Sequence, residues 1–112
     1  MKKRTIAVVL ALVIGAIAAL PVLAATPKIT GTVGPGFTIS LKKPTKAGKY
    51  TLVVSDKSSI HNFHLTGEGV DVNTGVSESG TDRFDVTVTE GTYTFVCDPH
   101  AGSMNGDFDV SG

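Results

Sequence analysis

From about residue 27 onward, hydrophobic and polar residues alternate in short runs that are separated by Gly, Pro, Asn and Ser. Residues 82–89, for example, place Phe84, Val86 and Val88 on one face and charged or polar residues on the other. Alternation with a period of two is typical of strands that have one buried face. No segment of this region longer than a turn has the pattern of a helix. The pattern therefore predicts an all-β domain.

The boundaries of the predicted strands follow from the Gly, Pro and Asn clusters between them. In the predicted strand over residues 37–42, Phe37, Ile39 and Leu41 are expected to face inward. Residues 67–80 are rich in Gly, Asp, Asn and Ser, and we expect a loop there with little regular pairing. Many short strands joined by turns favour a sandwich or a barrel. The strands are expected at residues 28–33, 37–42, 50–55, 60–66, 82–89, 92–97 and 106–110.

The first 25 residues differ in character from the rest of the chain. Three positive charges in residues 1–4 precede an apolar run over residues 6–20, and Pro21 and small residues follow. This order predicts a secretory signal peptide over residues 1–24, cleaved after Ala24 or, as the second choice, one residue later. The alternative is a retained anchor, because a spanning helix needs about 20 apolar residues. Either way, the domain over residues 25–112 is expected to be exported, to the periplasm or another extracytoplasmic site.

Length and charge exclude several classes of protein. The chain has 112 residues, too few for a multidomain enzyme. Its ten basic and ten acidic side chains balance, but without Lys2, Lys3 and Arg4 seven basic residues face ten acidic ones, a net charge of −3. The remaining Lys and Arg residues are scattered, so no nucleic-acid-binding stripe is predicted.

The chain has a single Cys, Cys97, which cannot form an internal disulfide in an exported protein. Such a Cys is a cross-linking site, a reactive group or a metal ligand. His100 and Met104 follow shortly after it, and His61 lies on an earlier predicted strand. A thiolate, two imidazoles and a thioether form the ligand set of blue-copper sites. Each residue alone has an ordinary explanation, but their convergence at one end of a sandwich favours a metal site.

His64 is the third His outside the N-terminal segment. It lies three residues after His61, so on one strand the two side chains would project from opposite faces. They would then not bind the same metal ion. We expect His64 to be a surface or sheet-face residue.

Residues 91–104, from Gly91 to Met104, resemble the C-terminal copper loop of the plastocyanin and pseudoazurin group of cupredoxins. The sequence His61-Asn62-Phe63 resembles the upstream His-Asn ligand motif of the same family. The resemblance implies a Greek-key β-sandwich of seven or eight strands with one type 1 copper ion, Cu(I) or Cu(II), at one end. Its implied ligands are the imidazoles of His61 and His100, the Cys97 thiolate and an axial Met104, with Asn62 tying the two ligand segments together by hydrogen bonds.

One departure from the family concerns the axial ligand. Three residues separate His100 from Met104, one fewer than in plastocyanin-like loops and one more than in amicyanin-like loops. This spacing bears on the distance of Met104 from the metal and hence on the reduction potential. Asp98, beside the thiolate, favours Cu(II) by simple electrostatics.

The resemblance implies a small blue copper protein that carries single electrons, with His100 as the electron port inside an apolar patch. Its expected partners are transient redox proteins of the membrane or cell envelope; no nucleic acid and no small-molecule substrate are expected, and the protein is expected to be a monomer. The alternative is a copper carrier or buffer that hands over the ion instead of the electron. Enzyme functions are disfavoured, because three His residues cannot supply the further copper centres of copper oxidases and nitrite reductases. The patch is expected to comprise Pro35, Pro99, Ala101 and Gly102.

Overall fold

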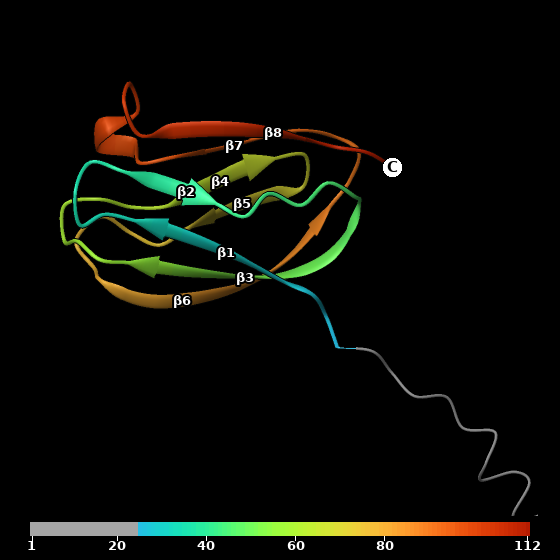
Figure 1. Cartoon of the computed structure of the whole chain (residues 1–112), viewed down its shortest axis with the longest axis horizontal. Helices are drawn as coiled ribbons and strands as arrows, with labels where there is room; N and C mark the ends of the chain where they lie inside the picture. The colour runs from blue at the N-terminus through green and yellow to red at the C-terminus, as the bar shows by residue number, and fades with distance from the viewer. Residues whose placement is uncertain (1–24) are drawn as a thin grey trace, which may run out of the picture.

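Two four-stranded sheets pack face to face in the computed structural model, which describes residues 25–112 (Figure 1). One sheet has the strand order β2-β1-β3-β6 and the other the order β5-β4-β7-β8. The predicted all-β sandwich of seven or eight strands is thus confirmed. The strands are β1 (Lys28–Val33), β2 (Ile39–Leu41), β3 (Gly48–Asp56), β4 (His64–Gly67), β5 (Val70–Asn73), β6 (Gly80–Val88), β7 (Gly91–Val96) and β8 (Asn105–Val110).

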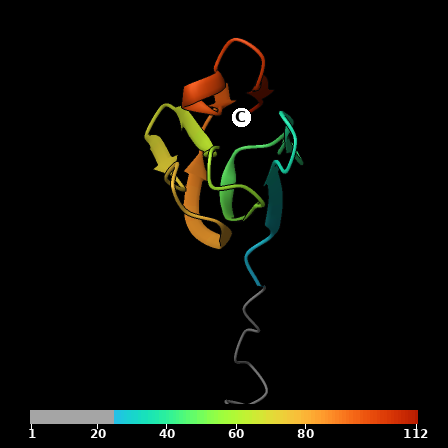
Figure 2. The ribbon, with the colours of Figure 1, turned by 90° about the vertical axis from the view of Figure 1, so that its left-hand side faces the viewer.

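The chain passes from one sheet to the other between β3 and β4, between β5 and β6, and between β6 and β7 (Figure 2). β1 and β3 run parallel, and the other strand pairs within the sheets are antiparallel. Connections that cross between the layers are typical of Greek-key sandwiches. They bring β4 beside β7, and so the His61 segment beside the Cys97 segment.

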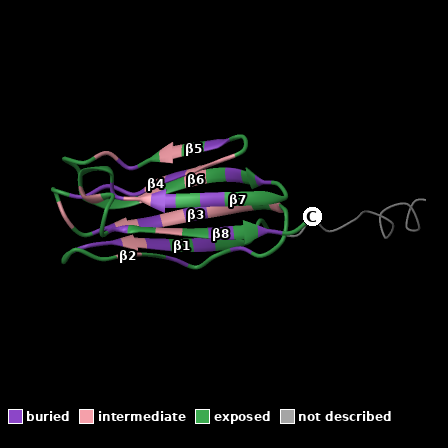
Figure 3. Ribbon diagram, turned by 90° about the horizontal axis from the view of Figure 1, so that it is seen from above, coloured by how far each residue is buried: buried purple, intermediate pink, exposed green. Residues whose placement is uncertain are grey.

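The core lies between the two sheets, and buried residues alternate with exposed ones along the strands (Figure 3). On β7, Tyr93 and Phe95 face inward. Phe95 stacks on Phe63 with ring centres 5.8 Å apart, and Tyr93 stacks on Phe108 at 5.5 Å. These aromatic pairs fix the spacing of the strands that lead to the metal-binding end.

Three sequence predictions about local structure were wrong. β4 begins at His64, so His61 lies on the connection that precedes the strand. Val70–Asn73, expected to be a loop, forms β5 because β4 supplies its hydrogen-bonding partner. Phe37 does not face inward but is 61% exposed, because the backbone amide of Gly34 bonds to the carbonyl of Thr38 and the strand starts only at Ile39.

The predicted signal peptide or anchor lies outside the described residues, so its cleavage stays a prediction. Over residues 25–112, the structure contains no helix whose length and hydropathy would allow it to cross a membrane.

Candidate metal centre

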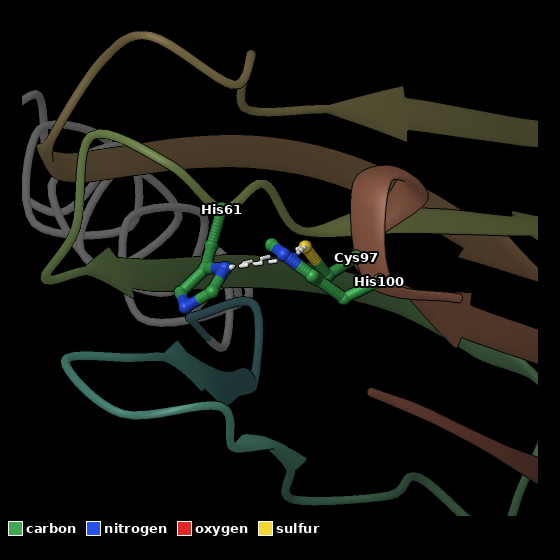
Figure 4. A group of neighbouring side chains, drawn as sticks. All are labelled: His61, Cys97 and His100. Carbon is green, nitrogen blue, oxygen red and sulfur yellow. Dashed lines mark hydrogen bonds between the residues drawn. The ribbon is translucent and has the colours of Figure 1, made fainter. Parts of the chain in front are cut away.

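Three potential ligands come together at one end of the sandwich, where the loops between the sheets meet. Cys97 directly follows β7, and His100 ends a short 3-10 turn, η1 (Asp98–His100). His61 belongs to the connection between β3 and β4. The three side chains point toward one another (Figure 4). Cys97 and His61 are buried, and His100 is half-buried.

The donor atoms form a triangle that fits one metal ion. Nδ1 of His61 lies 3.1 Å from Nδ1 of His100, and Sγ of Cys97 lies 3.6 Å from the first and 3.5 Å from the second. The centre of a triangle with these sides lies about 2.0 Å from each corner, close to the metal–nitrogen distance of about 2.0 Å and near the metal–sulfur distance of about 2.3 Å in protein sites. Two imidazoles and one thiolate in this arrangement fit copper.

Backbone hydrogen bonds fold the ligand loop back on itself. The amide of His100 donates to the carbonyl of Cys97 at 3.0 Å, and the amide of Met104 donates to the carbonyl of His100 at 2.9 Å. The amide of Cys97 in turn donates to the carbonyl of Met104 at 2.9 Å. Met104 is fully buried next to Cys97 in this ladder. Ligation of the metal by the Met104 thioether stays a prediction.

Comparison with known proteins agrees with this donor set. A family model described as copper binding proteins of the plastocyanin/azurin family matches residues 38–111, well over half of the chain. The chain belongs to the plastocyanin/azurin family. The resemblance seen in the copper loop is thereby confirmed, and the donor triangle is compatible with a single copper site.

Solved structures of two other proteins share the fold of this family member. Reduced rusticyanin superposes with a TM-score of 0.58 at 24% identity, covering 80% of this chain and 82% of its own. Auracyanin A, described as a "blue" copper protein from the green thermophilic photosynthetic bacterium Chloroflexus aurantiacus, gives a TM-score of 0.56 at 17% identity. That match covers 78% of this chain and all of auracyanin A. At these identities the matches establish the sandwich fold.

Asn62 ties the two ligand segments of the copper site together. Its side-chain carbonyl accepts a hydrogen bond of 2.7 Å from the amide of Asp98, and its Nδ2 donates to Oδ2 of Asp98 at 2.8 Å. The same Nδ2 donates to Oδ1 of Asn73 at 2.9 Å. Asn62 is fully buried. It directly follows His61 in the sequence and is hydrogen-bonded to Asp98, which directly follows Cys97. These contacts are those the sequence resemblance implied for Asn62.

A second network holds the connection that carries His61. The buried carboxylate of Asp56 accepts hydrogen bonds from the amide of Ser58 at 3.1 Å and from the hydroxyl of Thr74 at 3.5 Å. The Thr74 hydroxyl accepts from the amide of Phe63 at 2.9 Å. Burial raises the pKa of Asp56 above its ordinary value, although its two hydrogen bonds act in the opposite direction.

Sequence analysis missed the role of Phe37 at the copper site. Its ring meets the His61 and His100 rings edge-on, at 5.1 Å and 4.9 Å between ring centres. Nε2 of His61 is buried and has no hydrogen-bond partner among residues 25–112, so packing against neighbours such as Phe37 fixes the ring. The signal available in the sequence was the Gly34-Pro35-Gly36 turn, which ends β1 and displaces Phe37 from the next strand.

His64 does not belong to the ligand cluster, although the prediction from its spacing assumed that His61 and His64 share a strand and β4 begins only at His64. It begins β4, is half-buried, and contacts two carboxylates, those of Asp71 and Asp98. Sequence analysis gave no sign of these contacts, because Asp71 belongs to the strand that was expected to be a loop.

Proposed function

We propose that this chain is an exported blue copper protein that carries single electrons between redox partners. The observation that carries the proposal is the triangle of donor atoms from His61, His100 and Cys97, of which only His100 is half-buried. Copper held there supplies a one-electron couple between Cu(I) and Cu(II). Auracyanin A, described as a "blue" copper protein, shares the fold.

The scaffold supports electron transfer by limiting movement of the ligands. Cys97 and His100 are held by a loop whose backbone hydrogen bonds close on Met104, and Asn62 links that loop to the His61 segment. A site whose donor atoms are already in place needs little rearrangement when the charge of the ion changes. Such rigidity favours fast transfer of an electron.

The surface near His100 supplies a place for partners to dock. Pro35, Pro99, Ala101 and Gly102, predicted to form an apolar patch, are all exposed. Phe37 extends this patch, as its exposed ring touches the His100 ring. A small apolar patch suits brief encounters, because redox complexes bury little surface. We infer transient redox proteins of the membrane or cell envelope as partners, and a monomer as the working form.

Copper storage or delivery is the competing function, and the burial of the donors speaks against it. Cys97, His61 and Met104 are fully buried, so another protein has no direct access to three of the four predicted ligands. Handing over the ion would require the loop to open. Only His100 offers an edge to solvent.

The visible and EPR spectra of the copper-loaded protein, residues 25–112, test the proposal. We expect an intense blue thiolate-to-copper band and a narrow copper hyperfine splitting, both bleached reversibly by ascorbate. Cys97→Ser is the control and is expected to lose the blue band while remaining folded. A pale complex would overturn the type 1 assignment. Rapid loss of copper to a chelator, with slow electron self-exchange, would favour metal handling instead.

A further inference from the structure

We propose that His64 is a positioning residue of the copper centre: as an imidazolium between Asp71 and Asp98, it neutralises the carboxylate beside Cys97 and raises the reduction potential. The inference rests on the proposed electron-carrier function and adds to it a determinant of the driving force. His64 is not a ligand and lies outside the donor triangle.

The hydrogen bonds of the ring define its charge. Nε2 lies 2.6 Å from Oδ1 of Asp71, and Nδ1 lies 3.0 Å from Oδ2 and 3.2 Å from Oδ1 of Asp98. Ionised carboxylates only accept hydrogen bonds, and a neutral imidazole has one N–H. The ring can donate to both Asp71 and Asp98 only when both nitrogens carry a proton. The geometry is therefore that of an imidazolium.

The position of His64 on the sheet explains why two carboxylates reach it. On one neighbouring strand, β5, Asn73 lies opposite His64 and Asp71 lies two residues away on the same face. On the other neighbour, β7, Val96 lies opposite and Asp98 follows two residues later. Diagonal neighbours of this kind are within reach of long side chains.

The groups that face His64 all favour its charged form or are neutral. Asp71 on β5 and Asp98 after β7 are the charged groups that act on it, while Asn73 and Val96 carry no charge. Burial by itself lowers the pKa of His64, but the hydrogen bonds to Asp71 and Asp98 outweigh burial and the pKa is raised.

Asp98 connects this charge to the copper centre. It directly follows Cys97, and its Oδ2 also accepts the hydrogen bond from Asn62. An unpaired carboxylate at this position stabilises the more positive ion, Cu(II), and so lowers the reduction potential. The imidazolium of His64 offsets that effect. It also holds the Asp98 carboxylate in the orientation that Asn62 requires.

The test measures the reduction potential of the copper-loaded chain and of three variants, below the ordinary histidine pKa of about 6.5. In His64→Gln, which removes the charge, we expect a lower potential and a several-fold higher Cu(II)-to-Cu(I) ratio at a fixed solution potential. His64→Arg, which keeps a positive charge between the carboxylates, is expected to return the potential toward the original value. Asp71→Asn, which removes a negative charge, is expected to raise it.

Two results would overturn the inference. One is an unchanged potential in His64→Gln; the other is an equal shift in His64→Gln and His64→Arg, which would indicate loss of packing instead of loss of charge. ¹⁵N NMR of the ring in the Cu(I) protein gives an independent readout. We expect both nitrogens of His64 to be protonated, and a neutral ring would contradict the proposed imidazolium between Asp71 and Asp98.

The same spectra separate this inference from the proposed function. The type 1 band is expected to persist in all three variants, because none of them removes a ligand. An intact band with an unmoved potential overturns the role of His64 alone. Absence of the band from the unchanged chain overturns the proposed function, and with it this inference.

Discussion

Replacement of Asn62 by Ala removes the contact that joins the two ligand segments. The buried side chain makes three hydrogen bonds: it donates to the carboxylate of Asp98 and to the side-chain carbonyl of Asn73, and it accepts from the amide of Asp98. Ala leaves the Asp98 amide and one lone pair of its carboxylate without these partners. We expect Asn62→Ala to destabilise the fold and to loosen the loop that carries Cys97.

The magnitude follows from the kinds of bonds that are lost. A neutral hydrogen bond contributes about 0.5–1.5 kcal/mol to stability, and one to a charged group about 1.5–3 kcal/mol. Two neutral bonds and one charged bond give a loss of about 4 kcal/mol. Domains of this size have a free energy of unfolding of roughly 5–10 kcal/mol, so Asn62→Ala is expected to remove about half of it.

Urea unfolding of the copper-free protein measures this loss. Asn105→Ala is the matched control, because Asn105 is exposed and donates one hydrogen bond, to the carbonyl of Ala101. Its replacement is expected to cost about 1 kcal/mol or less. If Asn62→Ala costs no more than Asn105→Ala, Asn62 does not join the ligand segments as described. In the copper-loaded Asn62→Ala protein, we expect a weaker and broader blue band.

Cys97→Ser is expected to abolish the blue band and to leave the circular dichroism of a β-sandwich; a persistent band would disprove thiolate ligation. Gly67→Ala would bring a methyl group into the buried ring of Tyr93. Such overpacking is expected to lower the free energy of unfolding, measured in urea, by about 1–3 kcal/mol. Gly36→Ala, which has open space around it, is the near-neutral control. Because the folded-state pKa of His64 is raised, its contribution to stability is complete below the unfolded pKa of about 6.5 and is lost as the pH rises through the folded pKa. The free energy of unfolding of the copper-free protein should therefore fall as the pH rises from about 6.5 through the folded pKa of His64 in the unchanged chain, but not in His64→Gln. A rise over these pH values would contradict the charged contact of His64 with Asp71 and Asp98.

The copper loop was predictable from sequence because its ligands are neighbours. Cys97 and His100 lie three residues apart, so a short turn with Pro99 constrains both side chains whatever the rest of the chain does. His61 lies 36 positions away from Cys97. Its assignment as a ligand depended on the His-Asn motif. The strand predicted over residues 60–66 begins only at His64, so alternation along that strand does not place the His61 side chain.

The surroundings of the copper site were less predictable, because they depend on pairing between distant strands. β5 is short, contains Asp and Asn, and is a strand because β4 pairs with it. Local sequence preference is weak at such a sheet edge. The contact between Asp71 and His64 exists only once that pairing has formed. Phe37 was misplaced for a related reason: the turn before it, not the alternation after it, determines where β2 begins.

The ends of the described chain lie far from the copper centre. Lys28, which begins β1, pairs with Thr51, while the opposite end of the same strand pair, Val33 with Asp56, lies on the side of the metal loops (Figure 1). Gly112 lies against Glu90, in the turn before β7, and Cys97 follows the other end of that strand. An attachment made through either terminus therefore presents the His100 face outward. The protein could be immobilised on an electrode through a tag at either end of residues 25–112 with its His100 face directed toward solution.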